Sequence, residues 1–249
     1  MNEDENILLA DLRSLEEGLE GLIGVDEVGR GPLAGPVYAA SVFVNECWLR
    51  SIRNCGWVQK VNDSKKLSES DRRVVVKSVR RALLDSEGGL GFAVGVASIQ
   101  EIEAHNILNA TALAMNRSLE ELLGKLSEEE DIEIVRLQET LFGGMPKADC
   151  RRVEIVVDGR PMKKLNFSHR AVVKGDGKHF CVALASIIAK VARDELMNEL
   201  HQKYPQYGWD SNKGYGTHKH RDAIHEFGPT EHHRASFLKN IINPSSSKA

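Results

Sequence analysis

The most constraining feature of this sequence is a short apolar run that ends in two adjacent acids. Residues 22–25 have the composition of a buried strand, and Asp26 and Glu27 follow them directly. Charges at the end of a buried strand are costly unless they are compensated, and a metal ion is the usual compensator. Gly29-Arg30-Gly31 comes next, where the small glycines let backbone amides approach a phosphate or a sugar. These features together predict metal-dependent chemistry on a phosphodiester.

The composition indicates a soluble globular protein. The chain has 249 residues, of which 41% are hydrophobic and 28% charged. The longest apolar runs, 37–44 and 182–189, are too short to span a bilayer, and the acidic start has no signal-peptide character. The four cysteines have no paired spacing, and none lies near the histidines in a zinc-like pattern. We therefore expect a cytoplasmic protein with reduced thiols, no zinc site and no membrane association.

The distribution of charge is more informative than its sum. The net charge is −3, but residues 1–20 and 120–139 are each net −6, which leaves the rest of the chain net +9. The basic residues of that remainder gather in four stretches, at 65–66, 72–81, 163–178 and 213–221. A molecule with its charges segregated in this way can present a phosphate-binding face while staying acidic overall, although solvated surface is an equally good account of any single stretch.

The order of the predicted elements favours an α/β fold with a mixed central sheet and helices on both faces. Apolar runs predict strands over 22–27, 37–44, 91–97, 153–157 and 171–174. Helices are predicted from caps at 68–71 to residue 84, along an apolar stripe at 108–122, over 182–200 and over 218–227. We expect an acidic leader at 1–20, a catalytic domain at 21–205, a helical extension packed on it at 206–243, and a disordered tail at 244–249. Residues 124–150 are predicted to form a surface excursion.

Four acids fall at or just past predicted strand ends, where ligands collect in α/β sheets: Asp26, Glu27, Asp158 and Asp176. If the outer strands flank the first one, the four carboxylates converge and need cations to neutralise them. Mg²⁺ suits such hard oxygen ligands, and a pair of ions can activate water and stabilise a leaving oxygen. Neighbouring strand residues point to opposite faces, so we expect the first strand to end or bulge at the acid pair.

At these residues the sequence resembles the ribonuclease HII family, the type 2 ribonucleases H. The match runs from about 22 to 238 in the family's order and rests on the segments 24–36, 63–67, 106–111, 157–159, 173–178, 185–194 and 212–217. The resemblance implies a three-layer RNase H-like fold with a C-terminal helical extension. It also implies hydrolysis of RNA in RNA–DNA hybrids and incision 5′ of ribonucleotides embedded in duplex DNA, leaving 5′-phosphate and 3′-hydroxyl ends. The implied cofactor is Mg²⁺ or Mn²⁺, with two ions when substrate is bound, and we expect a monomer.

The resemblance also implies roles for individual residues. The metal-binding carboxylates fall on Asp26, Glu27, Asp158 and Asp176. The segment Gly29, Arg30 and Gly31 matches the one that reads the ribose 2′-hydroxyl, and Tyr215 matches the tyrosine that stacks on the adjacent sugar. By charge and position, Lys65 and Lys178 are candidate phosphate contacts. We rank Asp194 below Asp176 as a ligand, because a helical pair with Lys190 explains it.

Three features depart from the family pattern: Val28 in place of a commoner alanine, His179-Phe180-Cys181 in place of a serine-bearing stretch, and the long 124–150 excursion. Ribonuclease HIII shares the chemistry but would carry a sizeable N-terminal domain, and a type 1 enzyme would lack the acid pair. A non-catalytic nucleic-acid-binding module would gain nothing from carboxylates facing phosphates. A small-molecule phosphatase would not account for the basic stretches.

Overall fold

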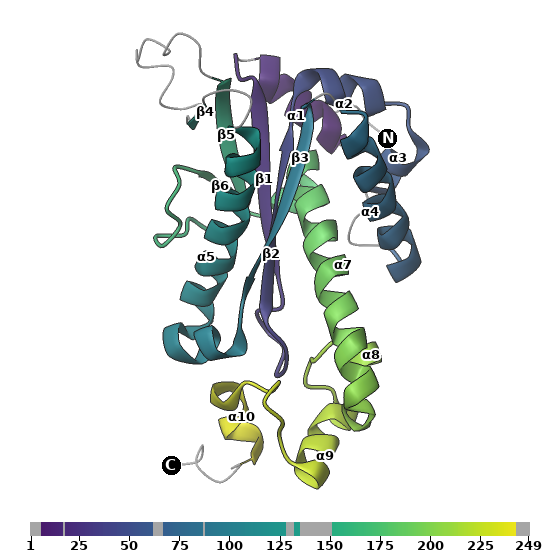
Figure 1. The fold of residues 1–249 in the computed structure, drawn as a ribbon, viewed down its shortest axis with the longest axis vertical. Coiled ribbons are helices and arrows are strands. Elements are labelled where there is room, and N and C mark those ends of the chain that lie inside the picture. The colour runs from purple at the N-terminus through teal and green to yellow at the C-terminus, as the bar shows by residue number, and fades with distance from the viewer. Residues whose placement is uncertain are drawn as a thin grey trace.

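A twisted mixed sheet forms the centre of the molecule, with helices on both faces (Figure 1). The computed structural model describes residues 6–16, 18–61, 67–86, 88–127, 132–134 and 151–242. Its strands are β1 (Gly21–Val28), β2 (Val37–Val44), β3 (Leu90–Ala97), β4 (Ile132–Ile134), β5 (Arg151–Asp158) and β6 (Arg170–Val172). The strand order is β3-β2-β1-β5-β4, and β6 pairs with the end of β5. The first three strands are antiparallel neighbours, whereas β5 runs parallel to β1, β4 and β6.

The alternation of side chains along each strand divides the core into two layers. On β1, Leu22 packs into one layer, whereas Ile23 and Val25 pack into the other. The first layer contains the helices α1 (Ile7–Glu16), α2 (Glu46–Ile52), α3 (Gly56–Val61), α4 (Glu69–Leu84) and α7 (Phe180–Lys203). The second layer contains the long helix α5 (Ile99–Leu126). This is the helix–sheet–helix arrangement that the order of elements predicted.

Helix α7 lies unusually close to β1, and Gly24 makes that contact possible. A β-carbon at Gly24 would come within 2.2 Å of the Cys181 carbonyl carbon at the start of α7. Any side chain at this position would push the helix away from the sheet. The close packing brings the first turns of α7 directly over the part of β1 that leads to Asp26.

Several local predictions are confirmed, because they depend on strong local signals. Strand β2 and helix α9 (His218–Phe227) have the predicted bounds, and α4 begins after Ser68, whose hydroxyl accepts a hydrogen bond from the Asp71 amide. The predicted apolar stripe of α5 is wrong at Leu108, which is 56% exposed. The backbone of Asn106 is non-helical, with φ of 65°, and turns this part of α5 away from the core.

The last helices form a separate packing cluster below the sheet in Figure 1. The extension contains η4 (Pro205–Tyr207), α8 (Trp209–Asn212), α9 and α10 (Ala235–Ile242). Its core surrounds Trp209 and includes Leu33 and Ala34 from the loop after β1. Leu33 and Ala34 also donate backbone hydrogen bonds to the Gly214 carbonyl oxygen. The extension is therefore built around the loop that follows the acid pair.

Some predictions concern residues outside the described ranges. These are Lys65, the predicted disordered tail and most of the 124–150 excursion, of which the end of α5 and strand β4 are described. The N-terminal segment predicted as an acidic leader contains α1, whose Leu8, Leu12 and Leu15 are buried in the first core layer. In the described part of the chain, no helix has the length and apolarity needed to cross a membrane.

Candidate active site

The site begins where β1 loses its parallel neighbour. The pairing of β1 with β5 ends at Val25 and Val157, so Asp26 and Asp158 are the next residues on adjacent parallel strands. Strand alternation directs both toward the face covered by α7. Asp26 is only 6% exposed, whereas Asp158 is partly exposed. Two of the predicted carboxylates are therefore brought together by the register of the sheet.

The negative charge of Asp26 is unfavourable in its surroundings. Burial raises the pKa of its carboxyl group well above the ordinary value of 3.8, and the negative charges of Glu27 and Asp158 raise it further. Hydrogen bonds from the Ser186 side chain and from the Glu27 amide, at 2.7 Å, oppose the shift without cancelling it. A carboxyl group in this setting gains more from a nearby cation than an exposed one would.

The prediction that β1 ends or bulges at the acid pair is wrong. The strand continues in regular antiparallel register to Val28, with Asp26 opposite Ala40 and Glu27 opposite Ala39. The chain turns only at Gly29, whose φ of +94° is unfavourable for other residues. The two acids thus leave opposite faces of one strand, beyond the last β1 residue that pairs with β5.

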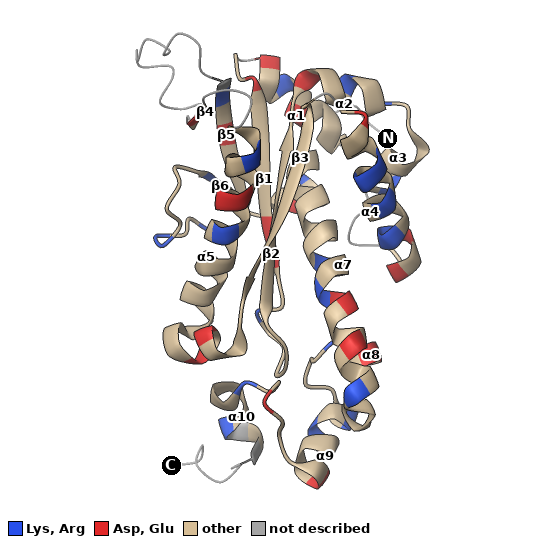
Figure 2. Ribbon diagram, viewed as in Figure 1, with Lys and Arg blue, Asp and Glu red and all other residues tan. Residues whose placement is uncertain are grey.

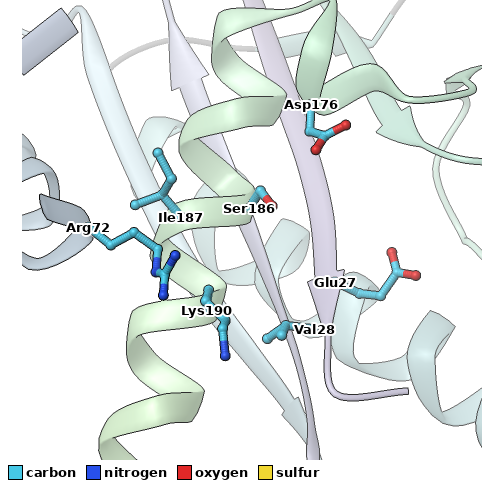
Figure 3. A pocket seen from close by; sticks show the side chains of 7 residues that line it. All are labelled: Glu27, Val28, Arg72, Asp176, Ser186, Ile187 and Lys190. Atoms are coloured by element: carbon cyan, nitrogen blue, oxygen red, sulfur yellow. The ribbon is translucent and has the colours of Figure 1, made fainter. Parts of the chain in front are cut away.

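Glu27 lines a cavity of about 160 Å³ together with Asp176, Ser186 and Lys190. Figure 3 shows the carboxylates of Glu27 and Asp176 on the same side of this cavity. On the side toward α4, Arg72 lines the cavity, and further Lys and Arg residues follow along that helix (Figure 2). Glu27 also accepts a hydrogen bond from Arg30 Nη1 at 2.9 Å.

Asp176 comes just past the end of β6, in the short 3-10 turn η3 (Gly175–Gly177). Strand β6 stops at Val172, because Lys174 adopts a left-handed conformation with φ of 57°. The Gly175 amide donates to Asp158 Oδ1 at 2.6 Å, which ties the turn to the end of β5. This contact, rather than a strand, brings Asp176 to the carboxylate group.

The donor set suits a hard divalent cation, because it consists of carboxylates whose shared charge is incompletely balanced. Within the described ranges, no three Asp, Glu, His or Cys side chains are already arranged to hold one ion. The carboxylates are gathered around one strand end and one cavity, but they are not preset as a coordination shell.

Two buried arginines shape the loop after the acid pair. Arg234 is fully buried and donates to the carbonyl oxygens of Gly29, Arg30 and Gly35 at 2.6 to 3.0 Å. Because a peptide unit directs its C=O and N–H to opposite sides, these contacts turn the Arg30 and Gly31 amides away from Arg234.

Arg193, also fully buried, donates to the carbonyl oxygens of Ala34, Pro36 and Lys213 at 2.9 to 3.1 Å. Sequence reasoning missed both arginines, since neither has a local signal that distinguishes it from a surface cation.

Tyr215 lies beside this loop. A β-carbon at Gly31 would be 3.6 Å from the Tyr215 ring, which is 45% exposed. The Tyr215 carbonyl oxygen lies 2.9 Å from His220 Nδ1, and the buried His220 accepts a hydrogen bond from Trp209 Nε1. The structure therefore brings the predicted glycine-arginine-glycine segment and the predicted tyrosine together at one surface.

The remaining predicted residues are placed as follows. Lys178 is exposed on the segment that links η3 to α7. Asp194 is buried and bonded to Lys190 at 2.5 Å, which is the helical pair expected from their spacing. Ser186 and Arg72 were not singled out from the sequence, although Ser186 lies in one of the segments that carry the family resemblance.

The fold is that of the solved ribonucleases H of type 2 and type 3. The solved structure of ribonuclease H2 from Pyrococcus horikoshii OT3 superposes with a TM-score of 0.62 at 22% identity, over 92% of this chain and all of that one. A mutant of Bst-RNase HIII gives a TM-score of 0.65 at 20% identity, over 96% of this chain and 74% of that one.

The sequence comparisons are more specific. The family model for ribonuclease HII matches residues 23–240. The ribonuclease HII of a Wolbachia from Brugia malayi is 42% identical, covering 92% of this chain and 94% of the relative. That of Caldicellulosiruptor bescii is 36% identical, covering 98% of each. The chain belongs to the ribonuclease HII family, and it is a metal-dependent endoribonuclease.

Proposed function

We propose that this enzyme hydrolyses the RNA strand of RNA–DNA hybrids and also incises duplex DNA on the 5′ side of a single embedded ribonucleotide. The products would carry 5′-phosphate and 3′-hydroxyl ends. Membership of the ribonuclease HII family supports the hybrid activity. The single observation that carries the finer proposal is the apposition of Gly31 and Tyr215 directly after the acid pair.

The proposed metal ligands are Asp26, Glu27, Asp158 and Asp176. The raised pKa of Asp26, caused by burial and by two neighbouring carboxylates, supports a cation as the missing balance of charge. A Mn²⁺ complex of the structurally similar Bst-RNase HIII agrees with divalent metal dependence. We propose two Mg²⁺ or Mn²⁺ ions, which when bound would acidify the attacking water and stabilise charge on the leaving oxygen.

The protein's own contribution is orientation. Asp26 and Asp158 are held by the sheet, and the Gly175 amide fixes the turn that carries Asp176. Placing the scissile phosphate against this group allows a water to attack in line with the leaving 3′-oxygen. Lys178, exposed just after the turn of Asp176, is proposed to contact a flanking phosphate. Lys65 is proposed for the same role from its charge and its place in the sequence alone.

Recognition of the ribonucleotide is proposed for the loop after β1. Arg234 pins the carbonyls of Gly29 and Arg30, so the amides of the following residues face away from it. Amides presented in this way can bond a ribose 2′-hydroxyl, the group that distinguishes RNA from DNA. The exposed ring of Tyr215 then offers a flat surface for the sugar next to the ribonucleotide.

The test is cleavage of a DNA duplex with one embedded ribonucleotide, compared with a continuous hybrid, with Mg²⁺ and with EDTA. We expect metal-dependent incision of the first substrate at the 5′ side of the ribonucleotide. Cleavage of the hybrid alone would favour the alternative of a ribonuclease HIII-like hybrid nuclease without specificity for single ribonucleotides. Cleavage of neither substrate by folded protein would refute the proposal and favour a binding module.

A further inference from the structure

The turn that carries Asp176 is held at both of its ends by buried or partly buried carboxylates. At one end, Asp158 accepts the Gly175 amide at 2.6 Å. At the other end, His179 is 8% exposed, and its Nδ1 lies 2.7 Å from Asp11 Oδ1. Asp176 and Lys178 lie between these two anchors. The position of the turn thus depends on two acids from distant parts of the chain.

Asp11 is an unexpected residue for this role, because it comes from α1. It is fully buried in the layer between α1 and α7. Its second oxygen accepts the Cys181 amide at 2.8 Å, which satisfies a free N–H in the first turn of α7. The Asp11 carboxylate therefore caps α7 and also contacts His179, the residue before the helix. Asp11 and His179 are 168 positions apart in the sequence.

The contacts on the other side of His179 decide which ring nitrogen donates a hydrogen bond and which accepts one. His179 Nε2 lies 3.4 Å from Arg170 Nη1, and Arg170 is paired with the fully buried Glu154 at 2.8 Å. An arginine can only donate, so Nε2 is the acceptor and Nδ1–H donates to Asp11. A continuous chain of contacts therefore runs from α1 through the end of the turn to β5 and β6.

We propose that Asp11 is a positioning residue for the metal site, acting through His179 on the turn that holds Asp176 and Lys178. This inference rests on the function proposed above for Asp176. Helix α1 ends at Glu16, before the span 23–240 that matches the family model, so this anchor is supplied from outside the matched span. Partners that orient a metal ligand typically change metal affinity or activity by about 10- to 100-fold when removed.

The variant Asp11→Asn tests the inference, because it keeps the shape of the side chain but removes its charge and one acceptor. The matched control is Glu16→Gln, which neutralises an exposed carboxylate on the same helix. Three quantities are compared: Mn²⁺ affinity without substrate by electron paramagnetic resonance, kcat and KM on a hybrid, and unfolding by urea in EDTA. We expect Asp11→Asn to weaken Mn²⁺ binding and lower kcat by about tenfold or more with little change in KM.

A purely structural role gives a different result. If Asp11→Asn lowers the unfolding midpoint but binds Mn²⁺ and turns over as Glu16→Gln does, the inference is overturned. Should Asp11→Asn not fold, His179→Ala replaces it, since Asp11 then still caps the Cys181 amide while the turn loses its contacts to Asp11 and Arg170. Wild-type Mn²⁺ affinity and kcat in His179→Ala would equally overturn it.

Adding Asp176→Asn to these variants distinguishes a failure of this inference from a failure of the proposed function. Inactivity of Asp176→Asn together with normal behaviour of Asp11→Asn would refute the positioning role alone. Full activity of Asp176→Asn would instead refute the metal-ligand assignment on which both depend.

Discussion

The carboxylate site and the loop that follows it solve opposite electrostatic problems. Around Asp26, one buried carboxylate lies beside partly exposed ones, and the pKa of Asp26 is raised by burial and by its acidic neighbours. Around the loop, Arg193 and Arg234 are buried, and burial lowers the pKa of Arg234 to about 9, with the charge of Arg193 adding to the effect. Both regions thus bring like charges together, one beside the end of β1 and the other around the loop that follows it.

The difference lies in what satisfies the charges. The two guanidinium groups donate to backbone carbonyl oxygens of the loop and of Lys213, and these dipoles complete their hydrogen bonding. Asp26 receives only two opposing hydrogen bonds while facing two more carboxylates. Among the described residues, the protein itself supplies partners for the two arginines, whereas the charge of the carboxylates is left for a cation to balance, as proposed above.

The largest effect is expected from Asp26→Asn. Turnover should fall to the background of the assay, because a proposed metal ligand is lost. The free energy of unfolding in EDTA should rise, because the substitution removes the charge whose burial and acidic neighbours raise the pKa of Asp26. Cleavage assays and urea denaturation measure the two effects. Asp222→Asn, an exposed change on α9, is the control, and a loss of stability in Asp26→Asn would contradict the comparison.

Arg234→Met should lower the free energy of unfolding, in contrast to Asp26→Asn. It leaves the carbonyls of Gly29, Arg30 and Gly35 without their donor, so we expect a loss of about 3 kcal/mol in unfolding free energy. The control is Arg80→Met on the exposed face of α4. Equal stability of the two variants, measured in urea with EDTA present, would show that the arginine does not hold the loop.

Tyr215→Ala tests the role of the loop region in recognising a single ribonucleotide. The ring is 45% exposed, so we expect little change in stability. Cleavage at a single ribonucleotide should fall by about tenfold to a hundredfold in kcat/KM, since stacking of this kind contributes about 1–3 kcal/mol. Phe227→Ala removes another exposed ring as the control. An equal loss on continuous hybrids would refute a specific role at the junction.

Glu101→Gln tests a third arrangement, in which opposite charges neutralise each other. Hydrogen bonding to Arg117 lowers the pKa of Glu101 from 4.5 to about 2. The carboxylate therefore adds stability above pH 4.5, and this contribution is lost as the pH falls from 4.5 through about 2. We expect the variant to lose about 1 kcal/mol or less at neutral pH, because the pair is partly exposed.

Urea titrations of the two proteins at decreasing pH measure this effect. The gap between wild type and Glu101→Gln should narrow below pH 4.5. A gap that stays constant through the acid range would show that the charge of Glu101 contributes nothing to the fold.

Features with a local cause could be predicted from the sequence. The strand before Asp26, the cap at Ser68 and the positions of Asp158 and Asp176 near one edge follow from apolar runs and turn residues. The bulge predicted at the acid pair was wrong, because the reasoning considered one strand alone. The neighbouring strand β2 pairs with β1 in unbroken register to Val28, which keeps β1 regular through both acids.

Asp11 and Arg234 could not be predicted from the sequence either, because their burial depends on distant parts of the chain. Asp11 looked like part of an acidic leader, and Arg234 looked like one of many surface cations. Each is buried because a distant part of the chain packs against it. Asp11 and His179 are 168 positions apart in the sequence, and Gly29 and Arg234 are 205 positions apart. The sequence by itself determined the strands, caps and carboxylates, since side-chain alternation and turn preferences act over a few residues. Only the tertiary structure decided which charges are buried and what satisfies them, because desolvation depends on every segment packed around a group.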